Sequence, residues 1–175
     1  MKDSIRAGYE ELGVTEYYKK HSEDYSNPHY DIIHDLLNQY IKAHNIGSNI
    51  LDLCCGSGEV TRVLNKAGNY NITGLDPYTA PAYKINTGKS CLIYDFKDII
   101  EGALENYKFD TIICSFAMHL CEESMLNNLL YQLSRISEHL IILTPHKRPE
   151  IKQWWVKEYE NKKDKVTIRV YRVQR

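Results

Sequence analysis

Apolar residues along this chain fall into short continuous runs and longer stretches with helical spacing. One short run directly precedes Cys54, and the others cover 70–75, 91–94, 111–114 and 140–143. After the first run, Val60, Val63 and Leu64 recur at the spacing of a helix with one buried face, and Gly68 follows where such a helix ends. Strands that alternate with helices predict right-handed crossovers and a doubly wound, mostly parallel α/β sheet with helices on both faces.

Further helices and a hairpin complete the predicted layout. The helices are predicted at 32–41, 99–104 and 126–133. Glu122 and Glu123 lie in the first turn of the last one, where the helix dipole favours acids. The end of the chain differs, because 153–159 and 166–173 are aromatic or β-branched and the polar stretch 161–164 separates them. This pattern predicts an antiparallel hairpin.

The most informative segment is the turn that joins the first predicted strand to the helix that follows it. Gly56 and Gly58 leave this turn without side chains where the N–H groups of a helix start face a ligand. A nicotinamide-binding turn has a third small residue, but that position holds Thr61. The turn instead resembles motif I of the class I S-adenosylmethionine-dependent methyltransferases. Asp52 and both glycines are in register, and Cys54 replaces the first glycine of the motif.

The resemblance continues at the ends of the later predicted strands. Asp76-Pro77 is similar to motif II, whose acid binds both ribose hydroxyls. Asp95-Phe96 resembles the pair that holds the adenine amino group and covers its ring. The segment 115–119, which begins with Ser115-Phe116, resembles the region beside the transferable methyl. The resemblance covers roughly residues 45–145 and implies that these residues and the motif I positions bind S-adenosyl-L-methionine.

The same resemblance implies a domain organisation and a lid. It implies one methyltransferase domain over 1–175 whose sheet has seven strands in the order 3-2-1-4-5-7-6, the hairpin being antiparallel. Residues 1–45 are expected to form a helical lid and 46–175 the Rossmann-like core. The lid residues expected to contact the cofactor are Tyr18, Tyr25 and His29.

Methyl transfer is a displacement at a sulfonium carbon, so the protein mainly aligns the nucleophile with the methyl group and supplies one base. His119 and His146 follow the fourth and fifth predicted strands, whose ends face the crevice where ligands bind in such sheets. Both are candidate catalytic bases, and a purely structural histidine is the alternative for each. We expect no metal site, because the Cys54-Cys55 pair lacks CxxC spacing.

The region after the fourth predicted strand lacks several acceptor-specific motifs. It contains neither Asp/Asn-Pro-Pro-Tyr nor a Pro-Cys pair, and no Lys-Asp-Lys-Glu set is recognisable in the chain. These absences favour an oxygen or nitrogen nucleophile on a small molecule as the methyl acceptor. Two alternatives stay open, an RNA or protein acceptor docked on the C-terminal hairpin and a cofactor-binding, catalytically silent partner subunit.

Charge and composition bear on the choice between these acceptors, on the state of the cysteines and on where the protein is expected. The net charge is −1, but residues 146–175 hold ten Lys or Arg against four Asp or Glu. A solvated hairpin rim explains this basic end more often than nucleic-acid binding does, so RNA is not the favoured partner. The five cysteines are expected to be reduced thiols. No apolar run approaches the roughly 18 residues that span a bilayer, so we expect a cytoplasmic protein without a membrane partner. The sequence does not define an oligomeric state.

Overall fold

The computed structural model describes residues 29–175, so that Tyr18 and Tyr25 lie outside the described part of the chain. Its helices are α2 (Tyr30–Ala43), α3 (Glu59–Ala67), α4 (Ala80–Thr87), α5 (Phe96–Ile100), the 3-10 turn η1 (Met118–Leu120) and α6 (Glu123–Ile136). Its strands are β1 (Asn49–Leu53), β2 (Asn71–Leu75), β3 (Phe109–Ser115), β4 (Ser137–Thr144), β5 (Trp155–Lys163) and β6 (Val166–Val173). None of the described helices is long and apolar enough to cross a membrane.

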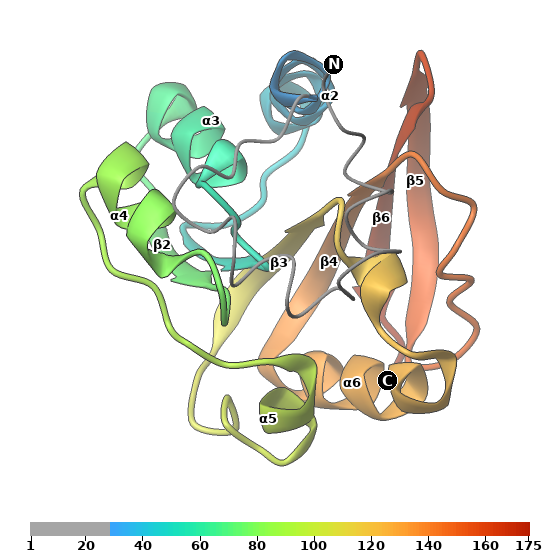
Figure 1. Ribbon diagram of the computed structural model, residues 1–175. Coiled ribbons are helices and arrows are strands. Elements are labelled where there is room, and N and C mark those ends of the chain that lie inside the picture. Colours follow the sequence, from blue (N-terminus) through green and yellow to red (C-terminus); the bar gives the residue numbers. More distant parts are fainter. Residues whose placement is uncertain (1–28) are drawn as a thin grey trace, which may run out of the picture.

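These strands form one sheet of six strands in the order β2-β1-β3-β4-β6-β5. The first four in this order are parallel, and β6 and β5 join them as antiparallel strands (Figure 1). The α/β architecture with a terminal antiparallel hairpin is therefore confirmed. The carboxyl ends of β1, β2 and β3 meet at one edge of the sheet, where such folds bind ligands.

The prediction of seven strands in the order 3-2-1-4-5-7-6 is wrong. The segment predicted as the third strand, 91–94, meets β2 only through an isolated bridge between Leu75 and Leu92. Leu92 and Tyr94 pack against the core, but the side chain of Ile93 is 64% exposed. Because only one side of this segment makes apolar contacts, it is an extended connection rather than a strand. It leads directly into α5.

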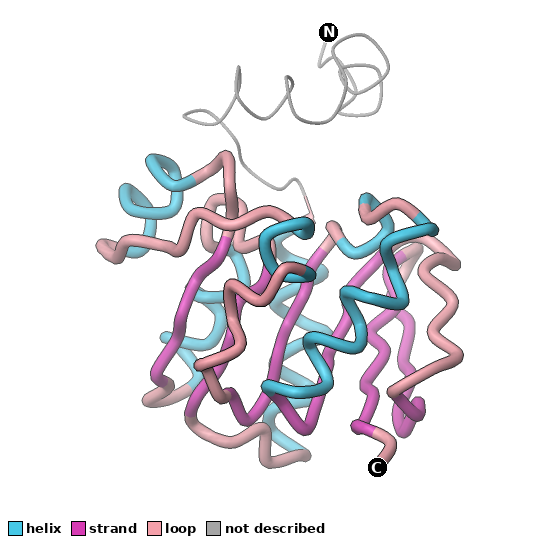
Figure 2. The backbone as a smooth tube through the Cα atoms, turned by 90° about the horizontal axis from the view of Figure 1, so that it is seen from below, coloured by secondary structure: helices cyan, strands magenta, loops and turns pink. Residues whose placement is uncertain are grey.

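Two apolar cores lie on opposite faces of the sheet. Along β3, Ile112 and Cys114 belong to the core that packs against α5 and α6, whereas Ile113 belongs to the core under α2 and α3. Figures 1 and 2 show these helices on either side of the strands. Burial of both faces confirms the predicted helices on both sides and explains the continuous apolar runs in the sequence.

The structure differs from the predicted elements at three places. Helix α4 was not predicted, because only Ala82 and Tyr83 of its residues are buried and its apolar periodicity is weak. The helix predicted at 99–104 is instead α5, which ends at Ile100 and continues as turns. In the hairpin, pairing extends to Lys163 opposite Val166, so the turn is shorter than the predicted 161–164.

Candidate active site

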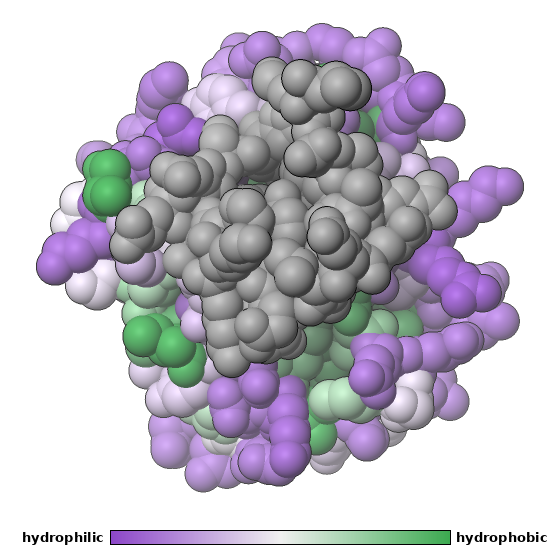
Figure 3. All heavy atoms as spheres, in the orientation of Figure 1, coloured by the Kyte–Doolittle hydropathy of each residue, from purple (hydrophilic) through white to green (hydrophobic). Residues whose placement is uncertain are grey.

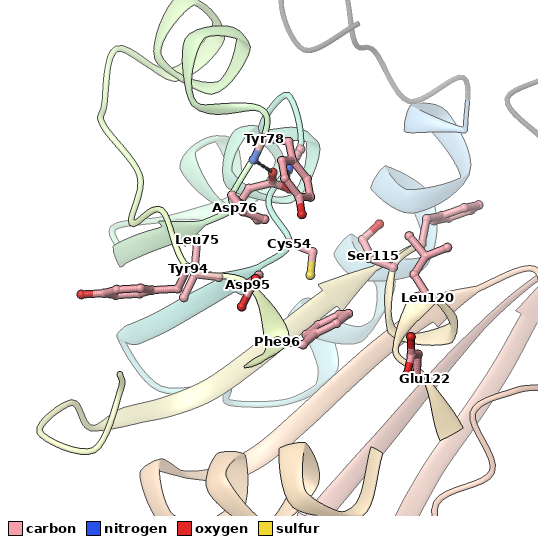
Figure 4. Close-up of a pocket in the computed structure, with 14 residues that line it drawn as sticks. Cys54, Leu75, Asp76, Tyr78, Tyr94, Asp95, Phe96, Ser115, Leu120 and Glu122 are labelled. Atoms are coloured by element: carbon pink, nitrogen blue, oxygen red, sulfur yellow. Dashed lines mark hydrogen bonds between the residues drawn. The ribbon is translucent and has the colours of Figure 1, made fainter. Parts of the chain in front are cut away.

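A cavity of about 420 Å³ opens at the carboxyl ends of the parallel strands. Figure 4 shows Cys54, Asp76 and Phe96 on one side of it, with Ser115 and Leu120 across from them. The described residues that line it are Cys54, Gly56, Leu75, Asp76, Pro77, Tyr78, Tyr94, Asp95, Phe96, Ser115, Phe116, Ala117, Leu120 and Glu122. Its volume lies within the range of about 300–1,000 Å³ that is typical of small-molecule sites.

The glycine turn at 54–58 has three residues in the left-handed region. The φ angles are 58° at Cys54, 55° at Gly56 and 91° at Gly58. Glycine adopts this region without steric cost, whereas a side chain is strained there, which explains why motif I has glycine at the position of Cys54. Gly56 lies on the cavity wall, but Gly58 faces α4 instead: a Cβ atom there would lie 2.6 Å from Cγ2 of Thr87.

The thiol of Cys54 faces the cavity and is a neutral group. A hydrogen bond with the thiol of Cys114 and burial raise the pKa of Cys54 well above its usual value. Cys54 therefore adds a polarisable, uncharged surface to the cavity rather than a thiolate. All five cysteines, including this pair, carry free thiols.

Asp52 lies beneath the glycine turn rather than on the cavity wall. Its side chain is only 1% exposed, and Oδ2 accepts hydrogen bonds from the Thr61 N–H (3.2 Å) and the Thr61 hydroxyl (2.7 Å). Burial raises the pKa of Asp52 to about 7, with a further contribution from the nearby Glu59 carboxylate, while the Thr61 hydrogen bonds oppose the rise. Asp52 thus ties β1 to the first turn of α3.

Asp76 lies on the cavity wall and organises the backbone around it. Oδ1 accepts hydrogen bonds from the N–H groups of Tyr78 (2.8 Å) and Thr79 (3.0 Å). Oδ2 accepts a longer hydrogen bond from the N–H of Gly56 (3.3 Å). Because Oδ2 has spare acceptor capacity, the carboxylate can accept a further hydrogen bond from a ligand hydroxyl.

Asp95 and Phe96 enter the cavity at the start of α5. Asp95 is the N-cap of this helix: its Oδ1 accepts from the Asp98 N–H (2.8 Å), and Asp98 Oδ2 accepts from the Asp95 N–H (3.0 Å). This capping box fixes the direction in which both residues point. Phe96 supplies a flat apolar surface opposite Leu120 (Figure 4).

Ser115 and Phe116 form the opposite wall at the end of β3. The hydroxyl oxygen of Ser115 is buried and has no hydrogen-bond partner, although the residue lines the cavity. A buried hydroxyl normally has a partner, so this group has capacity for a ligand. Phe116 has a φ of 57°, and the imidazole of His29 stacks on its ring at 5.0 Å with an angle of 13° between the planes.

His119 and His146 do not line this cavity. They lie in contact, with ring centroids 4.1 Å apart, and His119 lines a second cavity of about 360 Å³. That cavity is lined by Met118, His119, Cys121, Glu123, Leu126, Asn127, Arg148, Pro149, Glu150, Lys152 and Gln153. Burial, together with the neighbouring His146, lowers the pKa of His119 to about 4, so its imidazole is neutral at pH 7.

The turn η1 separates the two cavities. Ala117, Leu120 and Glu122 line the first one, whereas Met118 and His119 line the second. The segment 117–122 thus contributes residues to both cavities. This juxtaposition was not predicted from the sequence, because it depends on how the segment at 148–153 folds back against α6.

Several wall residues of the first cavity were not predicted either. These residues are Leu75, Tyr78, Tyr94, Leu120 and Glu122. Each of them is close in sequence to a predicted motif residue. This proximity could have identified them, because residues next to a strand end lie at the same edge of the sheet. No group of three side chains that could hold a metal ion occurs within residues 29–175.

Comparisons with known proteins place this chain in a family. A family model described as "Methyltransferase domain" matches residues 50–139. An uncharacterized protein of Schizosaccharomyces pombe is 33% identical over 87% of this chain and 78% of its own length. The chain belongs to the methyltransferase domain family and is a methyltransferase.

Two solved structures illustrate the similarity of fold. Magnesium protoporphyrin IX methyltransferase from Synechocystis, crystallised with bound S-adenosylmethionine, has a TM-score of 0.63 at 15% identity, over 97% of this chain and 95% of that one. A TehB-like S-adenosylmethionine-dependent methyltransferase from Corynebacterium glutamicum has a TM-score of 0.64 at 17% identity, over 89% and 99%. Both similarities are similarities of fold, and the methyltransferase domain family implies a methyl acceptor as a substrate of this chain.

Proposed function

We propose that this enzyme binds S-adenosylmethionine in the first cavity and transfers its methyl group to an oxygen or nitrogen atom of a small molecule. This acceptor would extend from the second cavity past η1, so that its reacting atom meets the methyl group directly. The observation that carries this proposal is the pair of cavities separated by η1, with the neutral imidazole of His119 on the acceptor side. The second cavity, about 360 Å³, has the size of a small-molecule site.

The chemistry of the first cavity fits the cofactor. Asp76 Oδ2 would accept hydrogen bonds from the ribose hydroxyls, and Asp95 would hold the adenine amino group beside the ring of Phe96. Gly56 leaves room for the methionine moiety, and the partnerless Ser115 hydroxyl supplies one more polar contact. When bound, the cofactor supplies an electrophilic methyl group on a sulfonium.

His119 would take the proton of the acceptor. Its low pKa makes it neutral, and thus able to accept a proton, across the neutral pH range. A weak base is sufficient for a hydroxyl acceptor, because its oxygen becomes strongly acidic as the bond to the methyl group forms. His146 contacts the ring of His119 and would support it in this role. The remaining task of the protein is alignment of nucleophile and methyl.

A single domain with an N-terminal lid is part of the same proposal. Within the predicted lid at 1–45, α2 packs on the core under α2 and α3, so that the residues before α2 would cover the cofactor and 46–175 would form the rest of the core. Of this lid, His29 supports the idea most directly, because it stacks on Phe116, a wall residue of the first cavity. The roles of Tyr18 and Tyr25 stay predictions of the sequence.

The charge distribution favours a small molecule over RNA. Most basic side chains of the C-terminal region have carboxylate partners, among them Arg169 with Glu160 (3.3 Å) and Arg172 with Glu158 (3.7 Å). Figure 3 shows a hydrophilic surface on this side, and the paired charges leave a weak net attraction for phosphates. A silent partner subunit would retain the first cavity without transferring a methyl group.

The acceptor class can be tested with S-adenosylmethionine that carries a labelled methyl group. The enzyme is incubated with small-molecule, RNA and protein fractions of the source cell, and each fraction is assayed for label. We expect label in the small-molecule fraction alone. Label in RNA or protein would replace our proposal with the docking alternative, and cofactor binding without label in any fraction would identify a silent subunit.

Asp76→Ala is expected to weaken binding of S-adenosylmethionine and of its demethylated product by about 1–3 kcal/mol, the cost of losing an acceptor of charge-assisted hydrogen bonds. Isothermal titration calorimetry measures this change. Asp110→Ala is a matched control: Asp110 also accepts two backbone N–H bonds, from Ser48 (2.8 Å) and Asn49 (2.9 Å), but outside the cavity. Equal affinities for wild type and folded Asp76→Ala would refute the ribose contact.

A further inference from the structure

Helix α4 packs directly against the glycine turn and β2. A Cβ atom on Gly58 would lie 2.6 Å from Cγ2 of Thr87, and one on Gly74 would lie 2.5 Å from Cζ of Tyr83. Both distances are too short for any side chain. The two glycines therefore let α4 approach the backbone that surrounds the cofactor cavity.

Two side chains of α4 form hydrogen bonds here, one with the backbone of the glycine turn and one with the Thr61 hydroxyl beneath it. The amide Nδ2 of Asn86 donates to the carbonyl oxygen of Ser57 at 2.9 Å, within the glycine turn itself. The hydroxyl of Tyr83, which is fully buried, lies 3.0 Å from the hydroxyl of Thr61. Because the Thr61 hydroxyl donates to Asp52, the Tyr83 hydroxyl donates to Thr61. Tyr83, Thr61 and Asp52 thus form a directed chain beneath the turn.

The other end of α4 contacts the second cofactor element. Its N-cap is Thr79, whose N–H donates to Oδ1 of Asp76 at 3.0 Å, and Oδ2 of the same carboxylate accepts from the N–H of Gly56. The helix is therefore bonded at its start to the acid proposed to bind the ribose and near its end to the glycine turn. A shift of α4 would move both.

We propose that Tyr83 and Asn86 are positioning residues that hold the glycine turn at 54–58 in the geometry that receives the cofactor. This inference rests on the proposed place of the cofactor in the first cavity. Neither residue lines that cavity, so their effect on affinity would pass through Ser57 and Thr61.

The inference is tested with Tyr83→Phe and Asn86→Ala. Each removes one hydrogen bond, and each should weaken binding of S-adenosylhomocysteine about 3- to 10-fold in calorimetry. In the cofactor-free protein, amide hydrogen exchange should become faster at residues 55–58 but stay unchanged in α6 and β4. Tyr70→Phe and Asn65→Ala are matched controls, since they remove the same groups outside the contacts with the glycine turn.

The outcomes separate this inference from the proposed function. Wild-type affinity with unchanged exchange at 55–58 in both variants would overturn the positioning role, while binding by the wild type would leave the cofactor assignment intact. Failure of the wild type to bind S-adenosylhomocysteine would instead overturn the proposed site. If Tyr83→Phe does not fold, Asn86→Ala decides alone, because Asn86 is an exposed residue.

Discussion

His119→Asn is expected to lower turnover by a factor on the order of 10² and to leave the affinity for S-adenosylhomocysteine nearly unchanged. His119 lines the second cavity and not the first, so its loss removes a base without touching the cofactor. The measurement is the rate of label transfer to the fractionated small molecules, compared with calorimetric affinity for the product.

The pH dependence of the wild type provides an independent check. A general base acts in its deprotonated form, and the pKa of His119 is lowered to about 4 by burial and by His146. The acid limb of kcat/KM should therefore fall near pH 4, whereas an ordinary histidine would give a limb near its usual pKa of about 6.5. Activity should be flat from neutral pH down to about pH 5.

His44→Asn is the control for this experiment, because His44 is an exposed histidine at the end of α2. His146→Asn should have a smaller effect than His119→Asn, since His146 contacts the base rather than lining the second cavity. Full turnover in the double variant His119→Asn/His146→Asn would show that no histidine acts as the base and would point to an acceptor that reacts already deprotonated.

The residues at strand ends could be predicted from the sequence because their positions follow from topology. Asp76 and Ser115 lie at the carboxyl ends of β2 and β3, and parallel strands that cross over in the right-handed sense bring these ends together. Asp95 follows the apolar run 91–94, which is not a strand but is bridged to β2 at Leu92 and so ends beside the same edge. No knowledge of side-chain packing was needed for this step. The structure places all three on the wall of one cavity.

Other features could not be predicted, because they depend on contacts between distant segments. The motif residue Asp52 was expected in the cofactor site, yet it faces α3 and bonds to Thr61. Helix α4 has weak apolar periodicity, and it packs into the space that Gly58 and Gly74 leave by having no side chains. The segment at 91–94 has the apolar character of a strand but contacts the core on one side only.

Asp52→Asn is expected to stabilise the protein above neutral pH. Burial raises the pKa of Asp52 from 3.8 to about 7, so the folded state holds a proton between these values while the unfolded state has lost it. By proton linkage, the stability contributed by Asp52 is fully present below pH 3.8 and is lost as the pH rises through about 7. A shift of this size corresponds to about 4 kcal/mol of unfolding free energy.

Asparagine has the shape of aspartate and keeps one oxygen that accepts from the Thr61 N–H and hydroxyl, but it has no charge to bury. The free energy of unfolding of Asp52→Asn, measured by urea denaturation from pH 4 to pH 8, should therefore rise relative to wild type as the pH increases and level off above about pH 7. Asp31→Asn, a change at an exposed carboxylate in the first turn of α2, should show no comparable rise. A constant difference between Asp52→Asn and wild type across this range would mean that Asp52 is charged at neutral pH and that the Thr61 hydrogen bonds outweigh its burial.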